Sequence, residues 1–254
     1  MRLRQVALAS RDLDLVAGQL RDVFGLNVAY NDPGIHHYGL KNAVLPAGYG
    51  FIEVVQPIRE DASAARFLAR RGGDAGYMVI LQTADAEAER ARVVALGVRV
   101  VDDIDSAHYR CAHFHPADFG GVLVSFDQQR TETDPLVPDG DWWPAGPDWR
   151  EARSGDVSDV AAVTLATGDP DALARRWSER LDRPLDPSDP GRLPLDRGVV
   201  RFVRARGSDT ATTIRAIDLE VADIALITRR ARSAGLDIDP DGVLIGGVRF
   251  RPVT

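Results

Sequence analysis

The sequence predicts an α+β fold built from four βαβββ modules that are arranged in two pairs. Two observations support this prediction. A strand-like run, a helical stripe and further strand-like runs follow one another, and the same order recurs along the chain. A segment rich in Pro, Gly and charged residues separates the first two occurrences from the last two.

The first module begins with RQVALAS, residues 4–10, whose alternating pattern predicts a half-buried strand. Residues 11–25 carry apolar side chains at helical spacing and end in Gly25, so they predict a helix. Three further strands are predicted between the turn signals NDPG and PAGYG, from the runs LNVAY, HHYGLKNAVL and FIEVVQP.

The second module repeats this order. YMVILQT predicts a strand, DAEAERARVVALG a helix, and VRVVD, YRCAHFH and GGVLVSF three more strands. After the linker the scheme starts again, with ATGD in the place of ASRD and LEVAD in the place of LQTAD. The predicted domains are residues 1–127, a linker at 128–157, and residues 158–254.

Composition limits the possible partners. The chain has 254 residues and a formal charge of −7, without a basic face, which argues against a nucleic-acid partner. No run approaches the roughly 18 apolar residues that cross a bilayer, so no membrane association is predicted. The single cysteine, Cys111, fits a reducing compartment, and a cytoplasmic protein is expected. All five histidines lie between positions 30 and 115, so polar chemistry is expected in the first half.

Strand alternation selects the side chains that can share one cavity, because alternate residues face opposite sides of a sheet. In FIEVVQP, Glu53 turns away from the apolar, helix-covered face, and Gln5 does the same in RQVALAS. In YRCAHFHP, this reasoning places Tyr109, Cys111, His113 and His115 on the cavity side. Cys111 is interpreted there as a small apolar filler, and Tyr77, on YMVILQT, as a core residue.

These motifs resemble the vicinal-oxygen-chelate superfamily, which includes glyoxalase I, methylmalonyl-CoA epimerase and antibiotic-resistance proteins. FHPADFGGVLVSF is similar to the closing strands of an epimerase, and FIEVVQP and GYMVILQTADAE are similar to other strands of the family. The resemblance implies two glyoxalase-like cups. It also implies a divalent metal ion on ligands from four positions, which here hold Gln5, Glu53, Met78 and Ser125.

The contents of these four positions argue against the metal ion. The family's usual set is His or Gln with Glu, followed by His with Glu, and a thioether or a neutral hydroxyl is a poor ligand for a hard divalent ion. No metal site is therefore predicted, unless His113 or His115 supplies the missing nitrogen. In the later modules the corresponding positions hold Ala162, Ala216 and, near the place of Glu53, Phe202.

Two functions are compatible with these residues. The first is a lyase, isomerase or hydrolase in which Glu53 transfers a proton on an enolisable carbonyl or an oxygenated aromatic compound. The alternative is a metal-free protein that sequesters a small molecule, and a buried Glu–His pair with only a structural role also stays open. The predicted catalytic residues are Glu53, His113 and His115, and the predicted substrate-binding residues are Gln5, His37, Met78, Tyr109 and Ser125.

The expected partner is a small molecule, and the protein is expected to be a monomer or a homodimer. The second half is interpreted as a structural companion of the first, in the place of the second subunit of shorter relatives. Three tryptophans in the linker, Trp142, Trp143 and Trp149, are expected to pack against the protein. Attachment of the two halves to each other is favoured over a lid above the site.

Overall fold

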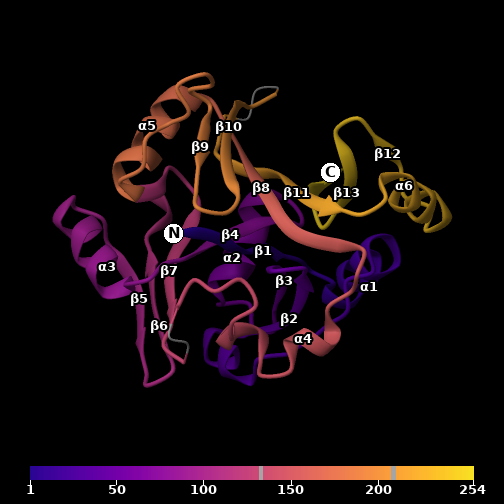
Figure 1. Cartoon of the computed structure of the whole chain (residues 1–254), viewed down its shortest axis with the longest axis horizontal. Helices are drawn as coiled ribbons and strands as arrows, with labels where there is room; N and C mark the ends of the chain where they lie inside the picture. The colour runs from indigo at the N-terminus through magenta and orange to yellow at the C-terminus, as the bar shows by residue number, and fades with distance from the viewer. Residues whose placement is uncertain (132–133, 207–209) are drawn as a thin grey trace. The chain divides into compact units, whose positions relative to one another are not determined.

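Figure 1 shows the computed structural model, which describes residues 1–131, 134–206 and 210–254. Two residues of the predicted linker, 132 and 133, lie outside these ranges. The chain divides into two compact units that are each assembled from separate stretches. Unit 1 comprises Met1–Arg4, Met78–Trp143 and Ala162–Ile214, and unit 2 comprises Gln5–Tyr77, Pro144–Ala161 and Arg215–Thr254. The predicted domain boundaries stay a prediction.

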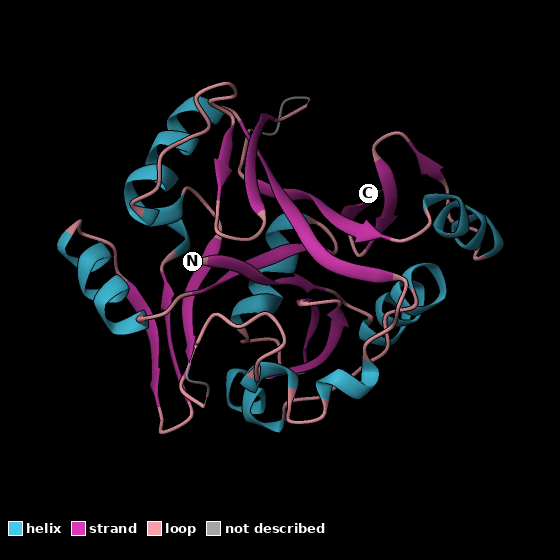
Figure 2. Ribbon diagram, viewed as in Figure 1, coloured by secondary structure: helices cyan, strands magenta, loops and turns pink. Residues whose placement is uncertain are grey.

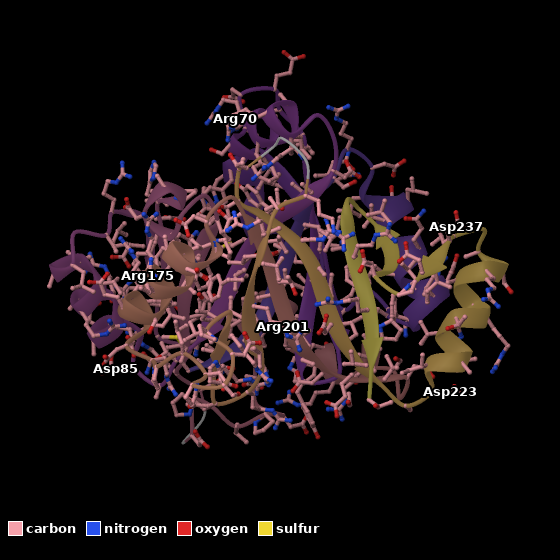
Figure 3. The ribbon with its side chains drawn as sticks, turned by 90° about the horizontal axis from the view of Figure 1, so that it is seen from above. Arg70, Asp85, Arg175, Arg201, Asp223 and Asp237 are labelled. Atoms are coloured by element: carbon pink, nitrogen blue, oxygen red, sulfur yellow. The ribbon has the colours of Figure 1, made fainter. Side chains whose placement is uncertain are left out.

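The internal repeat consists of four strand–helix pairs. Figure 2 shows the strands and helices of the chain in different colours. The pairs are β1 (Arg2–Ala9) with α1 (Leu13–Phe24), β4 (Ala75–Gln82) with α3 (Ala86–Ala95), β8 (Val157–Thr167) with α5 (Pro170–Leu181), and β11 (Thr213–Val221) with α6 (Ile224–Ser233). An aspartate precedes each helix, and its side chain accepts the backbone N–H three residues later, which satisfies one of the open N–H groups of the first turn. These caps are Asp12, Asp85, Asp169 and Asp223, two of which Figure 3 labels.

In the first module, β3 (Gly50–Pro57) pairs in parallel with β1 and antiparallel with β2 (Leu40–Ala47). Helix α1 packs on one face of these strands, where Leu8 and Val54 are fully buried. We call the opposite face the inner face of the first module. The strands predicted at RQVALAS and FIEVVQP are confirmed.

One strand prediction in this module is wrong, and another strand begins later than predicted, at Leu40. The run LNVAY contributes only an isolated bridge, between Tyr30 and Val44. The run HHYGLKNAVL does not begin as a strand, because His36 and His37 belong to the 3-10 helix η1 (Pro33–Tyr38). Asp32 caps this helix by accepting the N–H of Gly34, and Pro33 occupies its first position, which is a favourable start for a helical turn.

An unpredicted helix, α2 (Ser63–Arg71), lies on the inner face of the first module. Its buried residues Ala64 and Leu68 belong to one apolar cluster with Ala9 of β1 and Val55 of β3. The helix lacks a capping side chain at Ala62, and arginines occupy much of its exposed surface. Both features weaken the sequence signal for a helix.

In the second module, β7 (Leu123–Gln129) pairs in parallel with β4 and antiparallel with β6 (Tyr109–Phe114), which in turn pairs with β5 (Val100–Asp105). The 3-10 helix η2 (Pro116–Phe119) connects β6 to β7. The strands and the helix predicted for this module are confirmed. We call the face that carries Tyr109, His113 and Ser125 its inner face.

The third and fourth modules continue with β9 (Arg192–Pro194) and β10 (Val199–Arg204), and with β12 (Ile238–Asp239), β13 (Gly242–Ile245) and β14 (Val248–Val253). Glu53 of β3 lies opposite Ala7 of β1. In the third module, Thr164 of β8 is equivalent to Ala7, and it lies opposite Arg201 of β10. The position equivalent to Glu53 therefore holds Arg201, one residue away from Phe202, which the sequence predicts near this place. Such a slip moves a side chain to the other face of a strand.

The segment between the halves contains η3 (Trp143–Ala145) and α4 (Trp149–Ala152). Trp142 is buried within unit 1, where its ring lies edge-on to Tyr109 at 6.1 Å between centroids. Trp149 is buried within unit 2, edge-on to Phe51 at 5.0 Å. The expectation that these tryptophans pack against the protein is confirmed for both, whereas Trp143 is 55% exposed.

Membrane-spanning helices are missing from the described ranges, in which every helix is too short or too polar to cross a bilayer.

Candidate functional site

The carboxylate of Glu53 lies at the centre of a polar group on the inner face of the first module. The side-chain amide of Gln5 donates to Oε2 at 2.9 Å, and that of Asn42 donates to Oε1 at 2.7 Å. The three side chains come from β1, β2 and β3, whose pairing places them on one face. The structure thus brings together the two residues that alternation selected, Gln5 and Glu53, and adds Asn42, which the sequence reasoning missed.

The surroundings of Glu53 make it a stronger base than an ordinary glutamate. Burial raises the pKa of its carboxyl above the usual value, and this effect outweighs the hydrogen bonds from Asn42 and Gln5, which lower it. The nearby charge of Asp32 also raises the pKa. A glutamate with a raised pKa is suited to accept a proton and return it near neutral pH.

Apolar walls stand on both sides of Glu53 along β3. Phe51 precedes it on the same face and packs against Trp149 at 5.0 Å between centroids. Val55 follows it on that face and belongs to the apolar cluster with helix α2. The carboxylate is half-buried between these walls, which explains why desolvation dominates its pKa.

Asn42 connects Glu53 to the start of η1. Its Oδ1 accepts the backbone N–H of Asp32 at 2.8 Å while its Nδ2 donates to Glu53. His37 lies on the same 3-10 helix but is exposed, and its Nδ1 contacts the carbonyl oxygen of Gly34 at 2.5 Å. The role of His37 at the rim of a binding site stays a prediction.

Tyr77 occupies the start of β4 and packs against the same apolar cluster as Val55. It is half-buried, and its ring lies edge-on to Phe67 of α2 at 5.0 Å. Burial raises the pKa of Tyr77, and the charge of Glu53 raises it further. The side chain expected in the core therefore lies close enough to Glu53 for the two groups to interact electrostatically.

A second group of polar side chains lies on the inner face of the second module, within unit 1. The hydroxyl of Tyr109 donates to Asp127, and the pairing of β6 with β7 places His113 opposite Ser125. His113 Nε2 lies 3.7 Å from the sulfur of Cys111, and its Nδ1 lies 3.8 Å from a carboxylate oxygen of Asp102.

The electrostatics of this second group favour neutral forms. Burial lowers the pKa of His113, which keeps the imidazole uncharged near neutral pH, although the charge of Asp102 opposes this effect. Burial raises the pKa of the Cys111 thiol, and the charge of Asp127 adds to the rise. Because a thiolate is the nucleophilic form, this thiol is a poor nucleophile, as the sequence interpretation expects.

The remaining predicted residues of the second module differ in their surroundings. Met78 is buried, and the hydroxyl of Ser125 is buried without a hydrogen-bond partner among the residues that the structure describes. His115 follows the end of β6, so strand alternation does not place it beside His113. Its Nδ1 accepts the backbone N–H of Ala117 and lies 3.0 Å from Arg99.

Residues 135–142 of the linker pack against the second module and Arg4 within unit 1. Gln82 of β4 donates to the carbonyl oxygen of Pro135 at 2.6 Å, and Arg4 donates to that of Pro138 at 2.9 Å. The guanidinium of Arg4 also lies 5.2 Å from the centre of the Trp142 ring. Trp142 is thus buried between Arg4 and Tyr109 within unit 1.

The residues at the implied metal positions do not fit a divalent ion. Both carboxylate oxygens of Glu53 accept N–H groups from Gln5 and Asn42. Met78 and Ser125 offer a thioether and a neutral hydroxyl, which are poor ligands for a hard ion. In the described ranges, three or more His, Cys, Asp or Glu side chains never gather closely enough to hold a metal ion.

Comparison with known proteins identifies the family. A family model described as a glyoxalase-like domain matches residues 6–181, which is more than half of the chain. The chain belongs to the glyoxalase-like family. This membership confirms the resemblance to the vicinal-oxygen-chelate superfamily and the α+β fold of its cups.

The relatives of this glyoxalase-like protein include acyl-CoA epimerases. The ethylmalonyl-CoA/methylmalonyl-CoA epimerase of Cereibacter sphaeroides is 32% identical over 132 residues, which cover 50% of this chain and 97% of that protein. A variant of the methylmalonyl-CoA epimerase of Streptomyces coelicolor, solved with 2-nitronate-propionyl-CoA, is 26% identical, with a TM-score of 0.46, and the match covers 50% of this chain and 96% of that one.

A longer relative shares the fold over almost the whole chain. A mutant of 4-hydroxymandelate synthase from Streptomyces coelicolor is 17% identical, has a TM-score of 0.69, and covers 92% of this chain and 75% of its own. At this level of identity the likeness concerns the fold alone. It shows that the chain shares the fold of that enzyme over most of its length, and not only in the first two modules.

Proposed function

We propose that this protein is a glyoxalase-like enzyme in which Glu53 transfers a proton at the carbon next to the carbonyl of a small-molecule substrate. The observation that carries the proposal is a half-buried carboxylate with a raised pKa, held in place by Gln5 and Asn42. An ordinary glutamate is a weak base at neutral pH, and desolvation moves its pKa toward the working range.

The relationship to an acyl-CoA epimerase suggests a thioester as the substrate. Hydrogen on the carbon next to a thioester carbonyl is acidic enough for a carboxylate base in a partly apolar site to remove. The apolar walls at Phe51 and Val55 provide such surroundings. We therefore propose an acyl-CoA whose acyl group carries at least one hydrogen at that carbon.

The proposed step conserves all atoms. The C–H bond breaks, the proton moves to an oxygen of Glu53, and the electron pair forms an enolate with its charge on the carbonyl oxygen. The same carboxyl group then returns a proton to carbon. The hydrogen bonds from Gln5 and Asn42 keep the carboxylate in one orientation during both transfers.

Deuterium exchange tests this proposal. Methylmalonyl-CoA and ethylmalonyl-CoA are incubated with the protein in D2O, and mass spectrometry follows the gain of deuterium in the acyl group. We expect exchange with the unmodified protein, a 10²-fold to 10⁴-fold loss in Glu53→Gln, and a smaller loss in Glu53→Asp. Glu220→Gln, at an exposed position of β11, is the matched control. Undiminished exchange in Glu53→Gln would refute the proposal.

A metal-free binding protein is the second candidate. The poor fit of Met78 and Ser125 to a metal ion favours it, as does the aromatic wall formed by Phe51 and Trp149. In that case titration calorimetry detects ligand binding while deuterium exchange stays at the rate of the protein-free solution. Binding of equal strength in Glu53→Gln, without exchange in either protein, favours this candidate over the enzyme.

A further inference from the structure

The proposed proton transfer leaves negative charge on the carbonyl oxygen of the substrate, and a site that speeds this step must stabilise that charge. Enzymes do so with a metal ion or with hydrogen-bond donors that already point to the oxygen. The residues at the implied metal positions do not fit a divalent ion here. A donor near Glu53 is therefore required.

We infer that the hydroxyl of Tyr77 donates a hydrogen bond to this carbonyl oxygen, an inference that rests on the proposed function. Tyr77 packs against the apolar cluster that contains Ala9 and Val55. Val55 follows Glu53 on the same face of β3, and Ala9 shares that face on β1. The tyrosine thus lies beside the apolar wall that borders the carboxylate.

The hydroxyl of Tyr77 is available to a ligand. Within the described part of the chain this hydroxyl makes no hydrogen bond. The ring of Tyr77 packs edge-on against Phe67, at 5.0 Å between centroids. The ring is half-buried, so a fixed aromatic group presents one donor without a competing partner. A donor held in this way needs little reorganisation when charge develops on a bound oxygen.

The charges around Tyr77 suit this role. Burial and the carboxylate of Glu53 raise its pKa, so the hydroxyl keeps its hydrogen near neutral pH and can donate it. Arg66 and Arg70 of α2 act in the opposite direction, and their positive charge also favours an anionic oxygen nearby. Figure 3 shows Arg70 on this helix.

Other donors near Glu53 are already engaged. The side-chain amides of Gln5 and Asn42 face the carboxylate itself. His37 is exposed, and its Nδ1 contacts the carbonyl oxygen of Gly34. Tyr38 packs against the same cluster but has an interaction partner, so among the described residues of this cluster Tyr77 is the tyrosine whose hydroxyl makes no hydrogen bond.

Two measurements on Tyr77→Phe test the inference, with Tyr49→Phe as the matched control for loss of a tyrosine hydroxyl. Deuterium exchange into methylmalonyl-CoA should fall 10²-fold to 10³-fold in Tyr77→Phe, with little change in KM, because the hydrogen bond strengthens as charge develops. Binding of 2-nitronate-propionyl-CoA, whose anionic group imitates the enolate, should weaken at least tenfold, while binding of propionyl-CoA stays the same.

The outcomes separate this inference from the proposed function. If Glu53→Gln abolishes exchange while Tyr77→Phe keeps full exchange and full affinity for the nitronate, the inference is wrong and the proposed function stands. If Glu53→Gln retains exchange, the proposed function is wrong. Equal affinity of the unmodified protein for propionyl-CoA and for the nitronate also contradicts the inference, and this comparison needs no measurement of turnover. Thermal unfolding of Tyr77→Phe checks that the ring still packs on Phe67.

Discussion

The proton affinity of Glu53 should respond in opposite directions to two neighbouring substitutions. Asn42 donates to the carboxylate and lowers its pKa, whereas the charge of Asp32 raises it. Asn42→Ala removes the donor, so the pKa should rise further above the ordinary value. Asp32→Asn removes the charge but keeps a side-chain oxygen for the N–H of Gly34, so the pKa should fall while the cap of η1 is retained.

The size of the first effect follows from the hydrogen bond. At 2.7 Å between Nδ2 and Oε1, it is a charge-assisted bond, and such bonds contribute about 1.5–3 kcal/mol. A factor of ten in proton affinity corresponds to about 1.36 kcal/mol. Because Glu53 is half-buried and water can replace part of the bond, we expect a change near the lower limit, about tenfold. The effect of Asp32 should be smaller, since its charge is the weakest of the four causes that act on Glu53.

Carbon NMR of labelled carboxyl groups measures the titration directly, with Glu53→Gln identifying the resonance. The acidic limb of the exchange rate against pH should move with it, since the basic form of Glu53 exists above its pKa. The pH dependence of the unfolding free energy tests the direction of the pKa shift independently. A raised pKa in the folded state favours folding below the ordinary value of 4.5, and this contribution is lost as pH rises through the folded-state pKa. An unchanged titration in Asn42→Ala, or a rise in Asp32→Asn, would refute the reasoning.

Three predictions concern stability, measured as the free energy of unfolding in urea. Trp142→Ala should lower it by about 3–5 kcal/mol because the ring is buried, whereas Trp143→Ala, at a 55% exposed residue, should change it by less than about 0.5 kcal/mol. Gly48→Ala should lower the free energy of unfolding by more than about 2 kcal/mol, since φ is +66° and the added carbon would lie 1.8 Å from the carbonyl oxygen of Ser158. Gly72→Ala, at φ +75° but in open space, should lower it by about 1 kcal/mol. Tyr109→Phe should cost about 1.5–3 kcal/mol, because Asp127 loses a buried donor, and a loss below 0.5 kcal/mol would contradict that hydrogen bond.

The sequence was informative about the first module where its strands alternate strictly. Alternation in RQVALAS and FIEVVQP predicts that Gln5 and Glu53 face the same side, and the 2.9 Å hydrogen bond between them agrees. The run that contains Asn42 predicts a strand but does not by itself single out Asn42 as a site residue. A polar residue on the inner face of β2, opposite Val55, is the signal that could have identified it.

Other features could not be predicted because local signals conflict with tertiary contacts. Helix α2 has three arginines and no capping side chain, and packing of Leu68 against β1 and β3 residues stabilises it. The pair of Glu53 with His113 stays a prediction, since the two side chains belong to different compact units. The sequence places the equivalent of Glu53 only near Phe202 and not at Arg201, because strand register depends on partners that a single run does not reveal.

The four aspartate caps identify equivalent positions in the four modules, which helps in redesigning the protein. Two or three residues separate each strand from its helix, but the position seven residues before the cap is the first paired residue of the parallel strands in every module. Counting back from these caps gives Gln5, Met78, Ala162 and Ala216. An engineer who wishes to add a polar group to a cup therefore knows which residue to replace in each repeat, and the caps themselves should be left intact to keep that count valid.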